Sequence, residues 1–201
     1  MGEKVVLYSD PNCPFCYALG ERLLSLGVDE CVEWRGVQHA PMLPIPRLTD
    51  HQRLNAMIEQ EVCVVQRLAP DVPIRTLTGK PNTLPAIRAI AAMALRDVAL
   101  GTAFRHRTYR GLWQRNEDIS DARLLAAYVR DMGLEPLYPG PSADACIGEW
   151  AQCWDDLGVG SVPLLVKEDG EWLGGLVDEG RLAAFFGIRG NSRQHVVRDE
   201  R

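Results

Sequence analysis

The sequence of 201 residues predicts an α/β fold with a large helical insertion. First, an apolar run at 5–8, a helical pattern at 18–24 and an alternating segment at 31–37 indicate a strand–helix–strand unit, whose strands should be parallel. Second, residues 46–140 carry helical patterns and no strand signal. Third, two apolar runs on either side of the turn at 168–170 indicate a β-hairpin near the C-terminus.

The insertion is expected to contain four helices. Thr49 opens the first one as part of a capping box. Apolar residues at helical spacing over 84–98 indicate the second, with Gly101 just beyond its end. A third helix is indicated around 104–113, and Ser120 is the expected N-cap of the fourth.

The remaining segments complete the α/β unit. A long helix with Trp150 on its apolar stripe precedes the hairpin, and a short helix at 179–186 follows it. The last residues are polar and charged, as is typical of a frayed terminus. We therefore expect a discontinuous α/β domain, an inserted helical subdomain and a flexible tail, at residues 1–45 with 141–188, 46–140 and 189–201, respectively.

The composition argues against several kinds of partner. With 27 acidic and 22 basic residues the net charge is −5, and no Lys/Arg cluster stands out. Neither nucleic acid nor an anionic membrane surface is therefore an expected partner. No apolar run approaches the ~18 residues of a membrane span. Residues 1–4 leave no room for the hydrophobic region of a signal peptide, so we expect a cytoplasmic protein. The oligomeric state stays open.

Two cysteines three positions apart, Cys13 and Cys16, lie where the first strand passes into a helix. Residues i and i+3 of a helix face the same side, which brings the pair within the ~4.4–6.8 Å Cα separation that a disulfide allows. The helix N-terminus favours a thiolate through its unpaired N–H groups, and Pro14 suits the first helical position. This arrangement predicts reversible thiol–disulfide exchange, with Cys13 attacking and Cys16 resolving.

Other residues near this pair have weaker expected roles. Because the carboxyl ends of parallel strands share one edge, His39 should emerge beside the cysteines. A solvent-facing loop histidine is the favoured interpretation there, and a proton shuttle or charge partner for the Cys13 thiolate is the alternative. Phe15 and Tyr17 are expected to form an apolar contact surface for a substrate. The histidines not expected to take part in catalysis are His51, His106 and His195.

The other four cysteines are expected to be small core residues, since free cysteine is commonly buried. Six cysteines in 201 residues are too few for a disulfide scaffold. A zinc site needs four ligands at suitable spacing, and the sequence contains no second CxxC and no HxxxH pattern, so no metal is expected. The four expected core cysteines are Cys31, Cys63, Cys146 and Cys153.

This combination resembles the DsbA-like branch of the thioredoxin superfamily, which also holds the kappa-class glutathione transferases and the 2-hydroxychromene-2-carboxylate isomerases. The resemblance covers nearly the whole chain. It rests on the CxxC motif in a strand–helix turn, on the helical insertion and on a late Val-Pro pair before a hairpin. The supporting segments are 9–17, 32–35, 82–84, 118–121 and 158–163. The resemblance implies a thioredoxin-like fold with an inserted α-helical subdomain.

By position, Cys13 matches the nucleophile of that family and Cys16 its resolving cysteine. Pro163 matches the family's cis-proline, and Val162 is the residue before it. A cis bond there would turn the Val162 backbone toward the CxxC motif, where it could pair with an extended substrate. The substrate-binding residues expected on this basis are Pro14, Phe15, Val162, Pro163 and His39.

The resemblance favours a thiol–disulfide oxidoreductase that acts on protein or small-molecule disulfides through the Cys13-Pro-Phe-Cys16 pair. Two alternatives stay open. One is a glutathione-dependent transferase or isomerase of the kappa or hydroxychromene-carboxylate type, although isomerase members carry serine where this chain has Cys13. The other is a non-enzymatic binding module whose disulfide switches partner affinity. No bound cofactor is expected, and glutathione enters only as a co-substrate.

Phe15 bears on the redox poise. The periplasmic DsbA-type enzymes have histidine at this position, where it can stabilise the neighbouring thiolate by charge or hydrogen bond. Phe15 can do neither, and its ring shields the thiols from water, which disfavours charge further. We therefore expect a weaker oxidant, whose resting form in a reducing cytoplasm is the dithiol.

Overall fold

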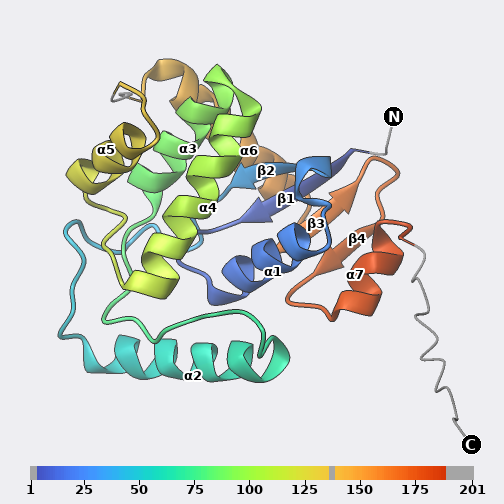
Figure 1. Ribbon diagram of the computed structural model, residues 1–201, viewed down its shortest axis with the longest axis horizontal. Coiled ribbons are helices and arrows are strands. Elements are labelled where there is room, and N and C mark those ends of the chain that lie inside the picture. The colour runs from blue at the N-terminus through green and yellow to red at the C-terminus, as the bar shows by residue number, and fades with distance from the viewer. Residues whose placement is uncertain (1–3, 136–138, 189–201) are drawn as a thin grey trace, which may run out of the picture.

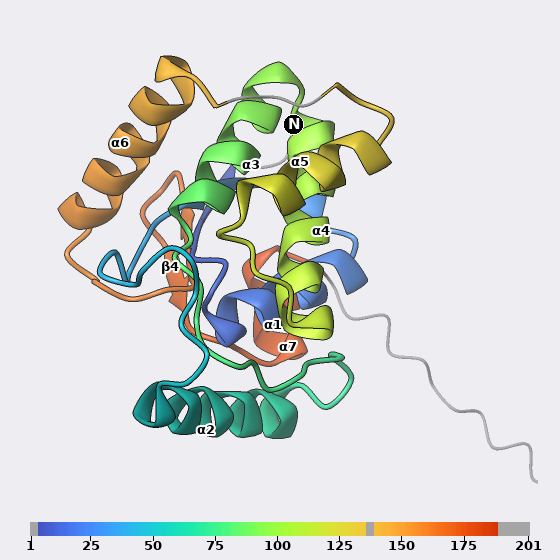
Figure 2. The same cartoon turned by 90° about the vertical axis from the view of Figure 1, so that its left-hand side faces the viewer.

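The structure is a computed structural model that describes residues 4–135 and 139–188 of the chain. The tail expected at 189–201 lies outside the described residues. In the described part, helices pack on both faces of a four-stranded sheet, and the helices from the middle of the chain gather at one side of it (Figures 1 and 2). The predicted α/β class with a helical insertion is confirmed.

The strands lie in the order β2-β1-β3-β4. β1 (Val5–Ser9) pairs in parallel with β2 (Val32–Gly36), as the strand–helix–strand pattern predicted. It pairs antiparallel with β3 (Leu164–Lys167), which forms the predicted hairpin with β4 (Trp172–Gly174). The helices are α1 (Pro14–Ser25), the short 3-10 helix η1 (Asp29–Cys31), α2 (Gln52–Leu68), α3 (Leu84–Arg96), α4 (Val98–Arg115), α5 (Ala122–Asp131), α6 (Pro141–Asp156) and α7 (Glu179–Phe185).

Successive side chains of β1 point to opposite faces of the sheet, as the period of a strand requires. Val5 and Leu7 pack with apolar residues of α1 and α7 on one face. Val6 and Tyr8 lie on the other face, against the cluster that contains side chains of α6. The sheet is therefore covered on both sides, and β1 lies inside it between β2 and β3.

The inserted helices share a hydrophobic core with the start of α1. One cluster of buried residues joins Cys13, Cys16 and Tyr17 to side chains of α2, α3, α4 and α5. Between residues 46 and 135 the described chain contains four helices and no strand, as expected. The CxxC motif thus lies where the insertion meets the sheet.

The second helix of the insertion ends earlier than its apolar pattern predicts. Asp97 is extended, with φ −162° and ψ 128°, and its side chain caps α4 by accepting from the Leu100 N–H at 2.9 Å. Gly101 therefore lies inside α4 and does not end a helix. A Cβ on Gly101 would lie 2.6 Å from the Cα of Ala94 in α3, so this glycine serves the close approach of two helices.

Two predicted N-caps are wrong. α2 is capped by His51 and not by Thr49, because the His51 ring nitrogen accepts from the Leu54 N–H at 3.2 Å. α5 is capped by Asp121, which follows Ser120 and accepts from the N–H of Arg123 at 2.8 Å. In both cases another polar residue closer to the helix makes the capping hydrogen bond.

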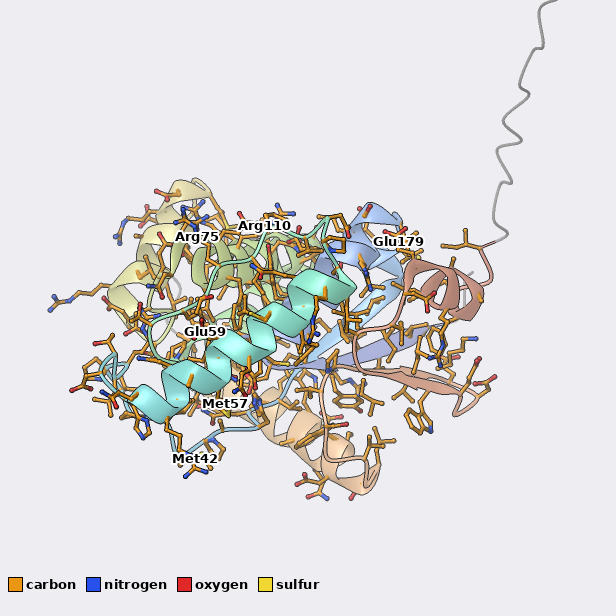
Figure 3. The ribbon with its side chains drawn as sticks, turned by 90° about the horizontal axis from the view of Figure 1, so that it is seen from below. Met42, Met57, Glu59, Arg75, Arg110 and Glu179 are labelled. Carbon is orange, nitrogen blue, oxygen red and sulfur yellow. The ribbon has the colours of Figure 1, made fainter. Side chains whose placement is uncertain are left out.

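Two of the expected core cysteines are exposed. Cys31 lies at the end of η1, and Cys63 lies on the outward side of α2. Figure 3 shows α2 crossing one face of the molecule, and Met57 and Glu59 are exposed on it. The apolar character of cysteine does not reveal which side of a helix faces the core. Cys146 and Cys153 are half-buried on α6.

We expect Gly101→Ala to lower the free energy of unfolding by about 1–3 kcal/mol, because the added methyl overlaps Ala94 of α3. Gly148→Ala in α6 is the matched control, since nothing lies within 4 Å of a Cβ added there. That change should stabilise the protein by up to about 1 kcal/mol through helix propensity alone. Denaturant unfolding followed by circular dichroism measures both. Equal stability of the two variants would contradict the close approach of α3 and α4.

Candidate active site

The two cysteines occupy the turn from β1 into α1. Cys13 is the N-cap of α1, with φ −96° and ψ 117°, and Pro14 is the first helical residue. The Cys13 N–H donates to the Asp10 carbonyl at 3.0 Å, which closes the turn. Cys13 is 6% exposed and Cys16 only 2%, so the first thiol is the more accessible one. This is the arrangement that the motif predicted.

The surroundings drive the acidities of the two thiols apart. A hydrogen bond from the Cys16 thiol is the largest influence on Cys13 and lowers its pKa; burial opposes this, and the Cys16 N–H and the charge of His39 add to the lowering. Burial raises the pKa of Cys16 well above the usual value, and the hydrogen bond with Cys13 raises it further. Cys13 is therefore suited to be the thiolate nucleophile and Cys16 to stay protonated.

His39 lies beside the pair and is held by a buried carboxylate. Its backbone N–H donates to Asp10 Oδ2 at 2.9 Å, and its ring Nδ1 lies 2.6 Å from the same oxygen. Asp10 is fully buried, whereas the His39 side chain is about one-third exposed. Burial lowers the pKa of His39, but the hydrogen bond and charge of Asp10 outweigh it and raise that pKa. The raised pKa favours the charged form of the ring, and the charge of His39 in turn lowers the pKa of Cys13.

Val162 and Pro163 reach the same place from the segment that precedes β3. The Val162–Pro163 peptide bond is cis. The Cys13 thiol donates to the Val162 carbonyl over 3.8 Å, a distance acceptable for sulfur. Val162 is half-buried and Pro163 is buried. The structure thus brings both residues to the cysteines, although they lie about 150 positions away in the sequence.

The residues inside and after the motif differ in exposure. Pro14 is buried, and Phe15 keeps part of its ring surface accessible. Tyr17 is 1% exposed because its ring stacks on Trp113 of α4, with 6.4 Å between ring centroids. Its hydroxyl donates to the Pro73 carbonyl at 2.8 Å. The expectation that Tyr17 belongs to a contact surface is wrong, because the insertion covers it.

Side chains of the insertion hold the turn that carries the motif. The Trp113 indole N–H donates to the Pro11 carbonyl at 2.9 Å. The Asn12 amide donates to the Pro81 carbonyl at 3.1 Å. The position of the cysteines therefore depends on α4 and on the loop before α3 as well as on the sheet.

Sequence reasoning missed three polar residues of this site. Asp10 stands directly before the motif, and an acidic residue between a buried strand and a CxxC pair was a signal that could have been read. Ser9 and Tyr109 share a buried hydrogen bond of 2.6 Å between their hydroxyls. These two lie 100 positions apart, and no local pattern connects them.

The described residues offer no metal site, since nowhere in 4–135 or 139–188 do three His, Cys, Asp or Glu side chains converge on one point. In the same part of the chain no helix combines the length and the apolar character needed to cross a bilayer.

We expect His39→Gln to raise the pKa of Cys13, because the change removes a nearby positive charge and keeps a polar side chain. Since one pKa unit is a factor of ten in thiolate fraction, alkylation of Cys13 near pH 6 should slow by about 3–10-fold and converge with the wild type at high pH. Peptide mass spectrometry after iodoacetamide treatment measures this. His51→Gln is the control and should leave the rate unchanged. Identical pH curves for His39→Gln and the wild type would contradict the charge interaction.

Solved structures show the same fold, and no curated protein sequence matches the chain. A Nitrosomonas europaea protein proposed to be a protein disulfide isomerase aligns with a TM-score of 0.74 at 18% identity, over 92% of this chain and 97% of that one. The cytosolic disulfide reductase DsbM from Pseudomonas aeruginosa aligns at 0.66 and 18%, over 89% and 90%. A 2-hydroxychromene-2-carboxylate isomerase aligns at 0.65 and 16%, over 91% and 92%.

The sequence profile of the DSBA-like thioredoxin domain matches residues 4–175. This range begins one residue before β1 and ends one residue after β4, so it covers the whole sheet and the helical insertion. It also contains the CxxC motif and the Val162–Pro163 pair. The chain therefore belongs to the family of DSBA-like thioredoxin domains.

Proposed function

We propose that the protein is a thiol–disulfide oxidoreductase in which Cys13 attacks a disulfide and Cys16 resolves the mixed disulfide. The observation that carries this proposal is the place of the two cysteines in the first turn of α1, with the more accessible Cys13 as N-cap beside the cis Val162–Pro163 bond. The opposite directions in which their surroundings shift the two pKa values agree with it. The Cys13 thiolate attacks one substrate sulfur, and the other sulfur leaves as a thiolate. Cys16 then loses its proton and attacks Cys13 Sγ, which releases the second substrate thiol. The substrate gains two electrons, and the cysteine pair becomes a disulfide.

The residues around Cys13 suggest how a substrate is held. The Val162 carbonyl accepts a hydrogen bond from the Cys13 thiol in the free protein. It can instead accept a hydrogen bond from a backbone N–H of an extended substrate. The partly exposed ring of Phe15 offers an apolar contact. His39 favours the thiolate both before the attack and when Cys13 acts as leaving group in the reverse direction.

Glutathione is the proposed co-substrate, which would reduce the Cys13–Cys16 disulfide again. DsbM from Pseudomonas aeruginosa has been solved with GSH, and the cytosolic setting of that protein supports a proposed cytoplasmic location here. A glutathione-dependent transferase or isomerase remains the second candidate, because an isomerase shares the fold.

Turnover of a mixed disulfide of glutathione with a small thiol, and of insulin, tests the proposal on two substrates of different size with glutathione as the reductant. The wild type should reduce at least one of them catalytically. Cys13→Ser should abolish turnover, because the nucleophile is gone. Cys16→Ser should accumulate a mixed disulfide on Cys13, which mass spectrometry detects. Glutathione binding without disulfide turnover would favour the transferase or isomerase, and neither binding nor turnover would favour a redox-switched binding module.

We expect Phe15→His to make the protein more oxidising. One added charge-assisted hydrogen bond to the Cys13 thiolate, of roughly 1.5–3 kcal/mol, corresponds to roughly 30–65 mV in a two-electron couple. Equilibration of both proteins with glutathione buffers of stated ratio measures the two potentials. Phe15→Leu adds no polar group and is the control. Its reduction potential should stay within about 10 mV of the wild-type potential. A Phe15→His protein with an unchanged or lower potential would contradict this account of the redox poise.

A further inference from the structure

Cys16 has a proton to lose and almost no contact with solvent. The thiol is 2% exposed, and burial raises its pKa well above the usual value. In the resolving step of the proposed function it must become a thiolate before it can attack Cys13. A buried group exchanges a proton efficiently only when an acceptor lies within hydrogen-bond reach or at the far side of one water molecule.

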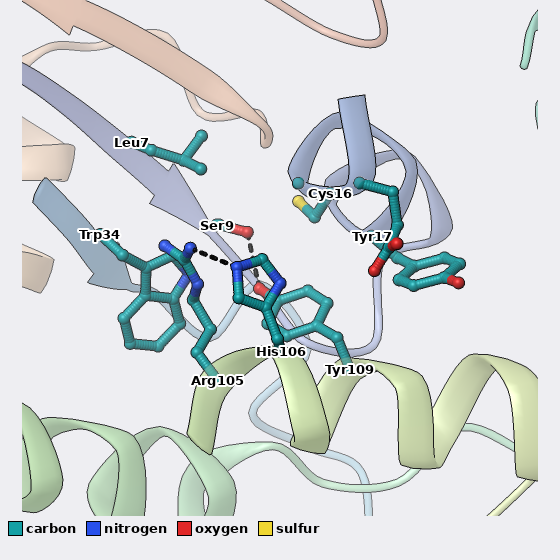
Figure 4. A pocket seen from close by; sticks show the side chains of 10 residues that line it. Leu7, Ser9, Cys16, Tyr17, Trp34, Arg105, His106 and Tyr109 are labelled. Carbon is teal, nitrogen blue, oxygen red and sulfur yellow. Dashed lines mark hydrogen bonds between the residues drawn. The ribbon is translucent and has the colours of Figure 1, made fainter. Parts of the chain in front are cut away.

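A small cavity borders Cys16. Its volume is about 20 Å³, enough for one water molecule, and its lining includes Ser9, Cys16, Tyr109 and His106. Figure 4 shows Tyr109 and His106 pointing from α4 toward Ser9 and Cys16. Hydroxyl, thiol and imidazole groups thus line one space.

Ser9 lines the same cavity as the Cys16 thiol, and its side chain lowers the pKa of Cys16 against the effect of burial. The Ser9 Oγ and Tyr109 Oη atoms are 2.6 Å apart, and either of them can be the donor. Both residues are almost fully buried, at 1% and 5% exposure. The pair can therefore pass a proton in either direction by reversing its donors and acceptors.

His106 stands at the outer end of the cavity. Its Nε2 lies 2.8 Å from Asp29 Oδ2, and Arg105 donates to the other oxygen of the same carboxylate. A hydrogen bond from Nε2 to Asp29 leaves Nδ1 as the acceptor nitrogen of the neutral ring. The His106 side chain is 15% exposed, so it can exchange its proton with solvent.

We propose that Ser9, Tyr109 and His106 form the proton outlet of Cys16, with His106 as the acceptor. This inference rests on the proposed function, and it assigns a role to a histidine for which the sequence indicated none. The outlet is distinct from the His39–Asp10 pair, which acts on Cys13.

The step balances as a shift of one proton along the chain. The Cys16 S–H proton passes to Ser9, the Ser9 proton to Tyr109, and the Tyr109 proton through one water to His106 Nδ1. The Cys16 thiolate then forms the bond to Cys13 Sγ, and the bond between Cys13 and the substrate sulfur breaks. That sulfur leaves with the electron pair, and His106 returns its proton to solvent. When the protein runs as an oxidant, the same chain delivers a proton to the leaving Cys16.

The groups around His106 carry both signs of charge: Asp29 Oδ2 lies 2.8 Å from Nε2, and the Arg105 guanidinium lies 3.1 Å from the same nitrogen. Burial raises the pKa of Asp29, but the hydrogen bond of His106 and the charge of Arg105 outweigh it, so Asp29 stays ionised as the counter-charge. On α1, Glu21 lines the cavity and is bound by Arg110 at 2.8 Å. Glu30 of η1 lines the neighbouring cavity together with His106.

The groups that face Cys16 do not compete as acceptors. Burial raises the pKa of Tyr17 to about 12 and that of Tyr109 well above the usual value, so neither is ionised near neutral pH. Cys13 has no proton once it is in the mixed disulfide. Asp10 faces the pair from the other side, where its carboxylate is bound to His39.

The resolving step can be isolated by a pH jump. The reduced protein is labelled with an aromatic disulfide that releases a coloured thiolate, at a pH near 4 where Cys16 stays protonated. After mixing into buffers from about pH 5.5 to about 9, which span the titration of histidine, colour appears only as Cys16 attacks Cys13. Cys16→Ser, which has no resolving thiol, measures any colour released from labels elsewhere, such as those on the exposed Cys31 and Cys63.

We expect the wild-type rate to depend less steeply on pH than the rate of a protein that lacks the His106 base. His106→Gln should be at least about tenfold slower at pH 7, and its rate should keep rising about tenfold per pH unit, since hydroxide then replaces the base. Tyr109→Phe should be slowed by a similar factor. Tyr17→Phe is the matched control, because it removes a hydroxyl that bonds away from the cavity, and it should stay within about twofold.

An unchanged rate and pH curve in His106→Gln would overturn the proposed acceptor. If that variant does not fold, Tyr109→Phe decides: a rate equal to that of Tyr17→Phe overturns the outlet. His39→Gln should keep the pH dependence of the wild type, and a dependence as steep as that of His106→Gln would show that the proton goes to His39 and not to His106. A wild type that releases no colour at all would overturn the proposed function itself, and the outlet with it.

Discussion

The site depends on the interaction of the Cys13 and Cys16 thiols at the N-terminus of α1. It is the largest influence that lowers the pKa of Cys13, and the same contact raises that of Cys16. Burial opposes the shift at Cys13 and reinforces it at Cys16. One thiol is thereby ready to attack while the other keeps its proton until a mixed disulfide forms. A helix N-terminus alone would favour a thiolate at either position.

The helical insertion is what keeps both cysteines in this relation. Trp113 and Tyr109 of α4 bind the turn that carries the motif through Pro11 and Ser9, and their rings form part of the core that encloses Cys16. The sheet sets the direction of α1, and the insertion buries the two cysteines. A loosened contact between α3 and α4 would therefore change the surroundings of the thiols as well as the stability of the fold.

Local patterns predicted most of the fold and the centre of the site, because they depend on neighbours in sequence. The parallel-strand rule even placed His39 correctly. What failed depends on distant contacts. Gly101 was interpreted as a helix end, although its role is to let α3 approach. Tyr17 was expected at the surface, although α4 covers it. The hydrogen bond between Ser9 and Tyr109 joins β1 to α4, and no sequence period relates these two elements.

The central claim is that the two thiols have different acidities before any substrate binds. Carbon-13 NMR of cysteine labelled at Cβ measures this directly in the reduced protein, with Cys→Ser variants to assign the signals. The account predicts that Cys13 titrates below the ~8.5 of a free thiol, while Cys16 shows no thiolate until well above it. Two thiols that titrate together near the free value, or a Cys16 that ionises first, would contradict it.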